Sequence, residues 1–144
     1  MDTFLSVVHV VGAVFIVGPM AILPMTGLRA LRTGAATSAR TLATSTTVFS
    51  GISVIIALIG FALVGLAPAK YDLRVTTPWV LWSIVLYAIA LVLSLFLVAP
   101  ALRGGAERIE AGTDAGSARA RVAAGSGIAS VLLLVVVVLM VAKP

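Results

Sequence analysis

The sequence predicts an all-α membrane protein, a bundle of four transmembrane helices that forms one domain over residues 1–144. Four stretches contain no Asp, Glu, Lys or Arg: 3–28, 41–69, 75–102 and 122–142. A hydrocarbon core about 30 Å thick requires roughly 20 apolar residues at 1.5 Å rise each, so every stretch can span it. Hydrophobic residues make up 61% of the chain and charged residues 10%, whereas soluble domains carry about 25% charged residues.

Within these stretches we expect four helices, at about residues 3–24, 41–67, 78–101 and 120–142. The first lacks a preceding basic segment and is followed by Arg29, so we interpret it as a retained helix and not as a cleaved signal peptide. Pro24 and Pro100 are expected to end the first and third helices, because proline cannot continue the backbone hydrogen-bond ladder. Pro78 suits the first turn of the third helix, and Trp79 beside it is typical of an interfacial aromatic belt.

Basic residues are unevenly divided between the connections. Seven arginines follow the first and third helices: Arg29, Arg32, Arg40, Arg103, Arg108, Arg119 and Arg121. Three basic residues belong to the other side: Lys70, Arg74 and Lys143. Because short loops rich in Lys and Arg face the cytoplasm, we predict that both termini are extracytoplasmic. We also expect 103–121 to be a flexible polar loop, with a short helical turn at 106–111.

Small and hydroxyl-bearing residues recur at helical spacing inside the predicted spans. The candidates for close helix packing are Thr46, Ser50, Ser53, Ala57, Gly60, Ser83, Tyr87, Ala90, Ser94 and Gly127. One interpretation is a polar conduction path; the other is tight helix contact, with hydroxyls bonded to backbone carbonyls. We favour helix contact, because membrane helices use small and hydroxyl residues in this way. Bulky substitution, as in Gly60→Leu or Ala57→Leu, is then expected to weaken assembly.

His9 is the one ionisable side chain within the predicted spans, and intramembrane ionisable residues are candidates for function. It shares a helix face with Ser6, Ala13 and Ile16, so we expect the imidazole to point into the bundle. Three hypotheses remain open: a neutral histidine bonded to a hydroxyl or carbonyl of a neighbouring helix, an axial haem ligand, and another role as a ligand of copper or a different metal or as a proton carrier. No histidine–methionine cluster accompanies it, and we predict no other metal ligand.

The residue inventory argues against most catalytic chemistry. The chain has no cysteine, which excludes thiolate metal sites and cysteine nucleophiles. No carboxylate lies within a predicted span, so an acid–base pair or an ion-coupling site of the usual transporter kind is not expected. The net charge of +5 is carried by short loops, where lipid headgroups explain it better than nucleic acid does. We therefore predict a protein that is not an enzyme and does not bind nucleic acid.

The segment from Val8 to Gly18 begins with a Val-His-Val-Val run and continues through small residues to a glycine. With the basic first connection, the Trp-led third helix and the Pro-Ala-Leu-Arg run at 100–103, it resembles a bacterial family of four-helix integral membrane proteins without an assigned activity, related to the copper-resistance-protein-D-like superfamily. Some relatives bind haem through the first-helix histidine, so the resemblance implies His9 as a haem b ligand. The multi-histidine and methionine sites of copper handlers are missing. The Val-, Ala- and Arg-rich usage is similar to that of high-GC actinobacterial proteins, in which such proteins can be accessory subunits of respiratory complexes.

We therefore expect a multi-pass protein of the bacterial cytoplasmic (inner) membrane that acts as a small, non-catalytic accessory or assembly subunit, for example in a respiratory terminal-oxidase assembly. Its partners would be other integral membrane subunits, and anionic lipids near the arginine-rich loops. On this hypothesis it carries no cofactor. The alternatives are a membrane redox protein that binds haem b through His9 and, third, a small transporter.

Overall fold

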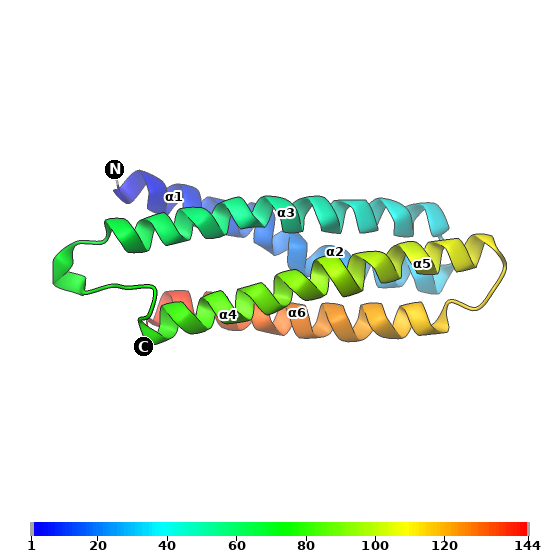
Figure 1. Ribbon diagram of the computed structural model, residues 1–144. Coiled ribbons are helices and arrows are strands. Elements are labelled where there is room, and N and C mark those ends of the chain that lie inside the picture. Colours follow the sequence, from blue (N-terminus) through cyan, green and yellow to red (C-terminus); the bar gives the residue numbers. More distant parts are fainter. Residues whose placement is uncertain (1, 144) are drawn as a thin grey trace.

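A computed structural model of the chain describes residues 2–143 and is built from helices laid side by side (Figure 1). The elements are α1 (Asp2–Gly12), η1 (Ala13–Val17), α2 (Gly18–Thr33), α3 (Ala36–Leu66), η2 (Ala69–Tyr71), α4 (Pro78–Leu93), η3 (Ser94–Val98), α5 (Ala99–Glu110) and α6 (Gly116–Ala142). Among the described residues, four continuous rods are long and apolar enough to cross a membrane: Thr3–Thr33, Ala36–Leu66, Pro78–Glu110 and Gly116–Ala142. The prediction of an all-α bundle of four transmembrane helices is confirmed.

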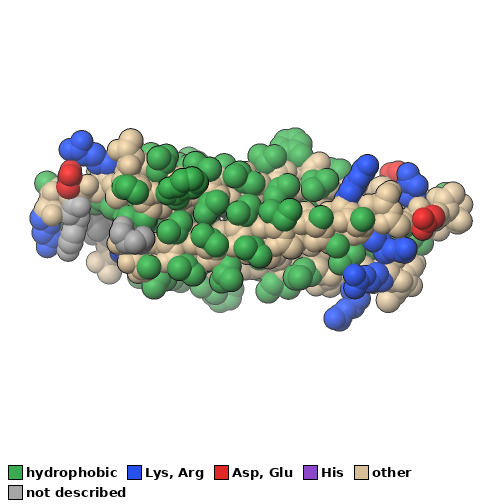
Figure 2. Space-filling model, turned by 90° about the horizontal axis from the view of Figure 1, so that it is seen from below, with side chains coloured by type: hydrophobic (Ala, Val, Ile, Leu, Met, Phe, Trp, Pro, Cys, Tyr) green, Lys and Arg blue, Asp and Glu red, His purple; other side chains and the backbone are tan. Residues whose placement is uncertain are grey.

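Successive rods run in opposite directions, so both ends of the chain lie at the same end of the bundle (Figure 1). Two short connections, at 34–35 and 111–115, join the rods at the opposite end, which carries the seven arginines and is called here the arginine-rich end. Charged side chains gather at both ends and hydrophobic ones cover the middle (Figure 2). The assignment of the arginine-rich end to the cytoplasm rests on the distribution of basic residues and stays a prediction.

The prediction that Pro24 and Pro100 end their helices is wrong. Pro24 is buried inside α2, which continues to Thr33, and Pro100 lies in the first turn of α5, which continues to Glu110. The first and third rods therefore extend well beyond the bounds expected from the sequence. A proline within a membrane helix is tolerated where local adjustment of the helix and contact with its neighbours satisfy the backbone groups that it frees.

That adjustment is visible as a widened turn just before each of two prolines. The π-helical segments η1 and η3 end two residues before Pro19 and Pro100, respectively. In η3 the N–H of Ala99 donates to the carbonyl of Ser94, five residues earlier instead of four. Proline has no N–H, and its ring collides with the carbonyl four residues before it. A widened turn relieves this collision and lets the rod continue.

The expectation of a flexible loop over 103–121 is also wrong, because helix occupies most of this segment. α5 extends to Glu110, α6 begins at Gly116, and 111–115 forms the turn between them. α5 buries Leu102 and Ala106 against the bundle, which explains why the helix persists after the apolar stretch ends. Arg40 and Glu110 form an ion pair at 2.8 Å, but both side chains are half-exposed, so it contributes little to stability.

The core at the arginine-rich end includes two leucines that fill spaces left by two glycines. A Cβ atom on Gly27 would lie 2.6 Å from Leu102 Cδ2, and one on Gly105 would lie 2.7 Å from Leu31 Cδ2. Leu31 and Leu102 are both fully buried, so α2 and α5 interlock through two reciprocal contacts. A second, smaller cluster in the middle of the bundle surrounds Met20. Small residues allow this close approach, which packing in lipid depends on.

Candidate functional site

The hydroxyl residues predicted on α3 lie on one buried face that points into the bundle. Thr46, Ser50 and Ser53 are each 0% exposed. Opposite them the third rod buries Ser83, Ala90 and Ser94. Ala57 and Gly60 continue the α3 face and are half-buried. These residues therefore contact helices of the same chain.

One hydrogen-bonded pair joins α3 to α4 within this face. Ser53 Oγ donates to the carbonyl of Ser50 at 2.6 Å and lies 2.7 Å from Tyr87 Oη. A serine hydroxyl has one proton, so Tyr87 must be the donor to Ser53. Ser83 differs, because its hydroxyl donates to the carbonyl of Trp79 on its own helix. This pattern of bonds is typical of helix contacts and supports the packing interpretation over a conduction path.

Three buried hydroxyls, those of Thr46, Ser50 and Ser94, have no hydrogen-bond partner among the described residues. The pairs Ser53–Tyr87 and Arg40–Glu110 define an antiparallel register between α3 and the third rod. In this register Ser50 and Ser94 lie at the same depth. Polar groups in hydrocarbon are costly to leave unpaired, and this level of the core holds two unpaired hydroxyls.

We expect Tyr87→Phe to lower the free energy of unfolding by about 0.6 kcal/mol and at most about 1.7 kcal/mol, the range measured for hydrogen bonds between membrane helices. The lost proton leaves Ser53 Oγ without its partner on α4. Ser53→Ala should cost a similar amount, and the double variant should cost less than the sum. Ser83→Ala is the matched control, since its bond joins no two helices. Equilibrium unfolding in mixed micelles measures all four; an additive double variant would contradict the pairing.

His9 joins the first rod to α3. Its Nδ1 lies 3.0 Å from the carbonyl oxygen of Ile56. A carbonyl oxygen only accepts, so Nδ1 carries the proton, and in a neutral ring Nε2 is left with the lone pair. The ring also rests on Gly60, where a Cβ would lie 2.8 Å from His9 Cε1. This is the arrangement that the first hypothesis for His9 requires, a histidine bonded to a carbonyl of a neighbouring helix.

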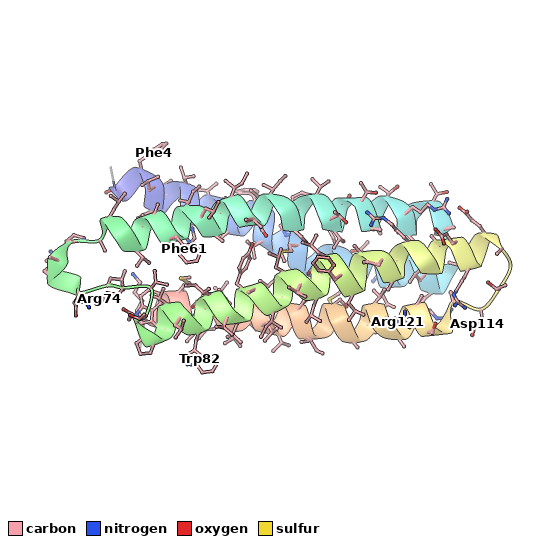
Figure 3. The ribbon with its side chains drawn as sticks, viewed as in Figure 1. Phe4, Phe61, Arg74, Trp82, Asp114 and Arg121 are labelled. Atoms are coloured by element: carbon pink, nitrogen blue, oxygen red, sulfur yellow. The ribbon has the colours of Figure 1, made fainter. Side chains whose placement is uncertain are left out.

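The same junction continues one turn along α1. A Cβ on Gly12 would collide with the side chain of Ile56, the residue whose carbonyl accepts from His9. α1 thus packs on α3 through a histidine and a glycine that both face Ile56. On the opposite side of α1, Phe4 points away from the bundle (Figure 3) and is 69% exposed.

The structure shows close-packing glycines that spacing alone did not reveal. Gly12, Gly27 and Gly105 each face a side chain of another helix at a distance that excludes a methyl group. On α6 the close contact belongs to Gly125, whose Cβ would lie 2.8 Å from Val98 Cγ2. Gly127, the candidate from the sequence, has no heavy atom within 4 Å of its Cβ position. The signal that could have found Gly125 is its 3–4 spacing with the buried residues before and after it.

No cluster of three or more His, Cys, Asp or Glu residues that could hold a metal ion occurs in the part of the chain from 2 to 143. Two grooves lie at the arginine-rich end, one between α5 and α6 and one between α2 and α3, and His9 lines neither. Within the described residues, the carboxylates that form ion pairs belong to the connections and to the arginine-rich end of α5.

Comparison with known proteins gives one match. No curated protein and no solved structure matches the chain. The relation to the copper-resistance-protein-D-like superfamily stays a prediction. A family described as predicted integral membrane protein (DUF2269) matches residues 3–144, nearly the whole sequence. Together with four apolar rods, this match shows that the chain belongs to that family of integral membrane proteins.

Proposed function

We propose that this protein is a non-catalytic accessory or assembly subunit of a larger complex in the bacterial cytoplasmic membrane, such as a respiratory terminal-oxidase assembly. The observation that carries the proposal is the outward face of α3. Seven residues at alternating spacings of four and three lie on this face, and all are exposed: Thr44, Val48, Gly51, Ile55, Leu58, Ala62 and Gly65. We call them the outer α3 face.

Two glycines give the outer α3 face its shape. Gly51 and Gly65 have no heavy atom within 4 Å of their Cβ positions, so they leave hollows that no other helix of this chain fills. Lipid chains gain nothing from such hollows, whereas a second helix can approach closely and pack into them. The outer α3 face therefore suits a transmembrane helix of another subunit better than it suits lipid.

The first rod supports the same proposal. In its most apolar part 6% of the residues are buried, against 17% to 22% in the other three rods. Phe15, in η1, is 70% exposed. α1 lies beside the second half of α3 (Figure 1). The exposed apolar residues of α1 therefore lie on the helix next to the outer α3 face. A partner could cover both.

The test is Gly51→Leu in the tagged chain, purified from native membranes in mild detergent with co-purifying subunits quantified. The leucine enters open space, so the fold should persist, while a partner helix should be excluded. Gly127→Leu is the matched control, because it also enters open space within a span but lies on α6. We expect stoichiometric partners with the wild type and the control, and at least a tenfold loss with Gly51→Leu.

Recovery of the wild-type chain alone would contradict the proposal. Equal partner loss in both leucine variants would show that the outer α3 face is not the contact. Stoichiometric recovery of subunits from a different membrane complex would support the accessory role and overturn the assignment to a terminal oxidase.

One observation favours the alternative of a haem b protein. The bond from Nδ1 to Ile56 leaves Nε2 with a free lone pair, the state that a histidine needs in order to bind iron. The fit is partial, because one side of the ring is already occupied by its contact with Gly60. A Soret band that disappears in His9→Ala would establish this alternative, and a colourless wild type would exclude it. A transporter is third, since no buried charge supports ion coupling.

A further inference from the structure

A groove of about 540 Å³ lies at the arginine-rich end, between η3 and α5 on one side and the start of α6 on the other. Its wall changes character along its length. Phe96, Leu97 and Pro100 line the part that faces the membrane interior. The rest of the lining includes three charged residues and two hydroxyl residues: Glu107, Arg108, Arg121, Thr113 and Ser117.

Small residues hollow this groove out. A Cβ on Gly104 would meet nothing within 4 Å, so the glycine leaves open space on the face of α5 that lines the groove. Three alanines also line the groove: Ala101 on α5, Ala111 in the connection and Ala118 on α6. Below the groove the helices are in close contact, because Gly105 lies against Ala118. The groove is therefore bounded by packed helices, and the connection at 111–115 adds Ala111 and Thr113 to its lining.

The charged groups of the groove lie at two depths. Gly125 packs against Leu97, and the two helices are antiparallel, so Arg121, one turn earlier, lies near the level of Ala101. Arg108 is seven residues further along α5, or roughly 10 Å closer to the end of the bundle. Arg121 is thus the more deeply placed arginine, at the boundary of the apolar region. Figure 3 shows it on the first part of α6.

Arg121 has no hydrogen bond or ion pair with any other described residue. An arginine at the edge of the hydrocarbon is costly unless it reaches water or pairs with an anion, and lipid phosphates lie at this depth. Arg108 donates to the carbonyl of Asp114 at 3.3 Å, which holds its guanidinium beside the groove. Together with Glu107, these two arginines give the lining a net charge of +1.

We propose that this groove binds one anionic phospholipid from the leaflet at the arginine-rich end. Arg121 pairs with the phosphate, an acyl chain lies along Phe96, Leu97 and Pro100, and hydroxyls of the headgroup bond to Glu107. The net charge of the lining balances a single phosphodiester, which favours a headgroup with hydroxyls and no ammonium, as in phosphatidylglycerol. The site is separate from the outer α3 face and does not depend on the proposed accessory function.

The experiment uses the full chain, purified in detergent and incubated with phosphatidylglycerol or phosphatidylethanolamine of the same acyl chains. Bound lipids are then counted by native mass spectrometry. We expect one phosphatidylglycerol per chain, retained about tenfold better than phosphatidylethanolamine, and about a tenfold loss of retention in Arg121→Gln, because a charge-assisted bond is removed. Arg32→Gln, an exposed arginine of the same end outside the groove, is the matched control.

A second variant tests the hollow itself. Gly104→Leu places a side chain in the groove without a clash, so it should abolish retention while leaving the thermal stability unchanged. Equal retention of both lipids, equal losses in Arg121→Gln and Arg32→Gln, or undiminished retention in Gly104→Leu would each overturn the proposal. The second of these outcomes would show diffuse attraction to the arginines as a group.

Discussion

Leu102→Ala is expected to lower the free energy of unfolding by about 2 kcal/mol, the largest stability effect that we predict for a single apolar truncation in this chain. Leu102 is 0% exposed and fills the space over Gly27. The estimate lies at the lower end of the range for soluble cores. When the helices separate in lipid, a leucine side chain moves into surroundings as apolar as the core, so its burial contributes less to stability than it would in water. What is lost is the contact between α2 and α5.

The reverse change tests the same contact from the other side. In Gly27→Ala the new methyl would lie 2.6 Å from Leu102 Cδ2, and such overpacking typically costs about 1–3 kcal/mol. When Leu102 is also truncated, the methyl enters the space that the leucine leaves. We therefore expect the double variant to be more stable than the sum of the single effects by at least about 0.5 kcal/mol.

Equilibrium unfolding in mixed micelles, followed by circular dichroism, measures this cycle. Leu134→Ala is the matched control, since Leu134 lies on α6, is 63% exposed and should lose little when truncated. If Leu134→Ala lowered the free energy of unfolding as much as Leu102→Ala does, contact with the micelle, and not helix packing, would explain both changes. Strict additivity of Gly27→Ala and Leu102→Ala would contradict the interlocked arrangement.

Gly60→Leu is expected to separate the first rod from the second half of α3. Its Cβ would lie 2.8 Å from His9 Cε1, so the imidazole must move and the bond from Nδ1 to the Ile56 carbonyl must lengthen or break. We expect a loss of about 1–3 kcal/mol from overpacking, and increased hydrogen exchange confined to α1 and η1.

The chain provides its own control for this prediction. Gly51→Leu introduces the same side chain nine residues earlier on the same helix, but into open space, so it should preserve stability and exchange protection. In a second comparison, His9→Ala removes the ring that the leucine meets, so His9→Ala combined with Gly60→Leu should recover part of the lost stability. An equal loss in both leucine variants would show that helix propensity or micelle contact, and not His9, causes the effect.

The fold could be predicted from the sequence because it depends on the composition and length of each segment, and both can be read along the chain without knowledge of tertiary contacts. The hydrocarbon core excludes charge and requires each segment to satisfy its own backbone hydrogen bonds, so charge-free stretches of sufficient length must be helices. The inward hydroxyl face of α3 was also predictable, since Thr46, Ser50 and Ser53 follow the 3–4 spacing of one helix side.

The helix ends were not predictable by the same reasoning. In water-soluble proteins a proline usually marks a helix boundary, and this expectation failed at Pro24 and Pro100. The turn η3 widens the helix ahead of Pro100, and the buried face of α5 packs on α2 and α3, which favours continued helix. Whether packing outweighs the cost of a proline depends on neighbouring helices, which no local pattern describes.

The sequence by itself determined that this chain is a membrane bundle of four helices, how its charges divide between the two ends, and that His9 is the one histidine of its spans. Only the tertiary structure decided which neighbours individual residues contact. In it His9 contacts Ile56 and Gly60, Gly51 faces away from the other helices, and a groove lies beside Arg121. The physical reason is that helical periodicity defines the faces of each helix, whereas the rotation and register of neighbouring helices depend on how their side chains fit together.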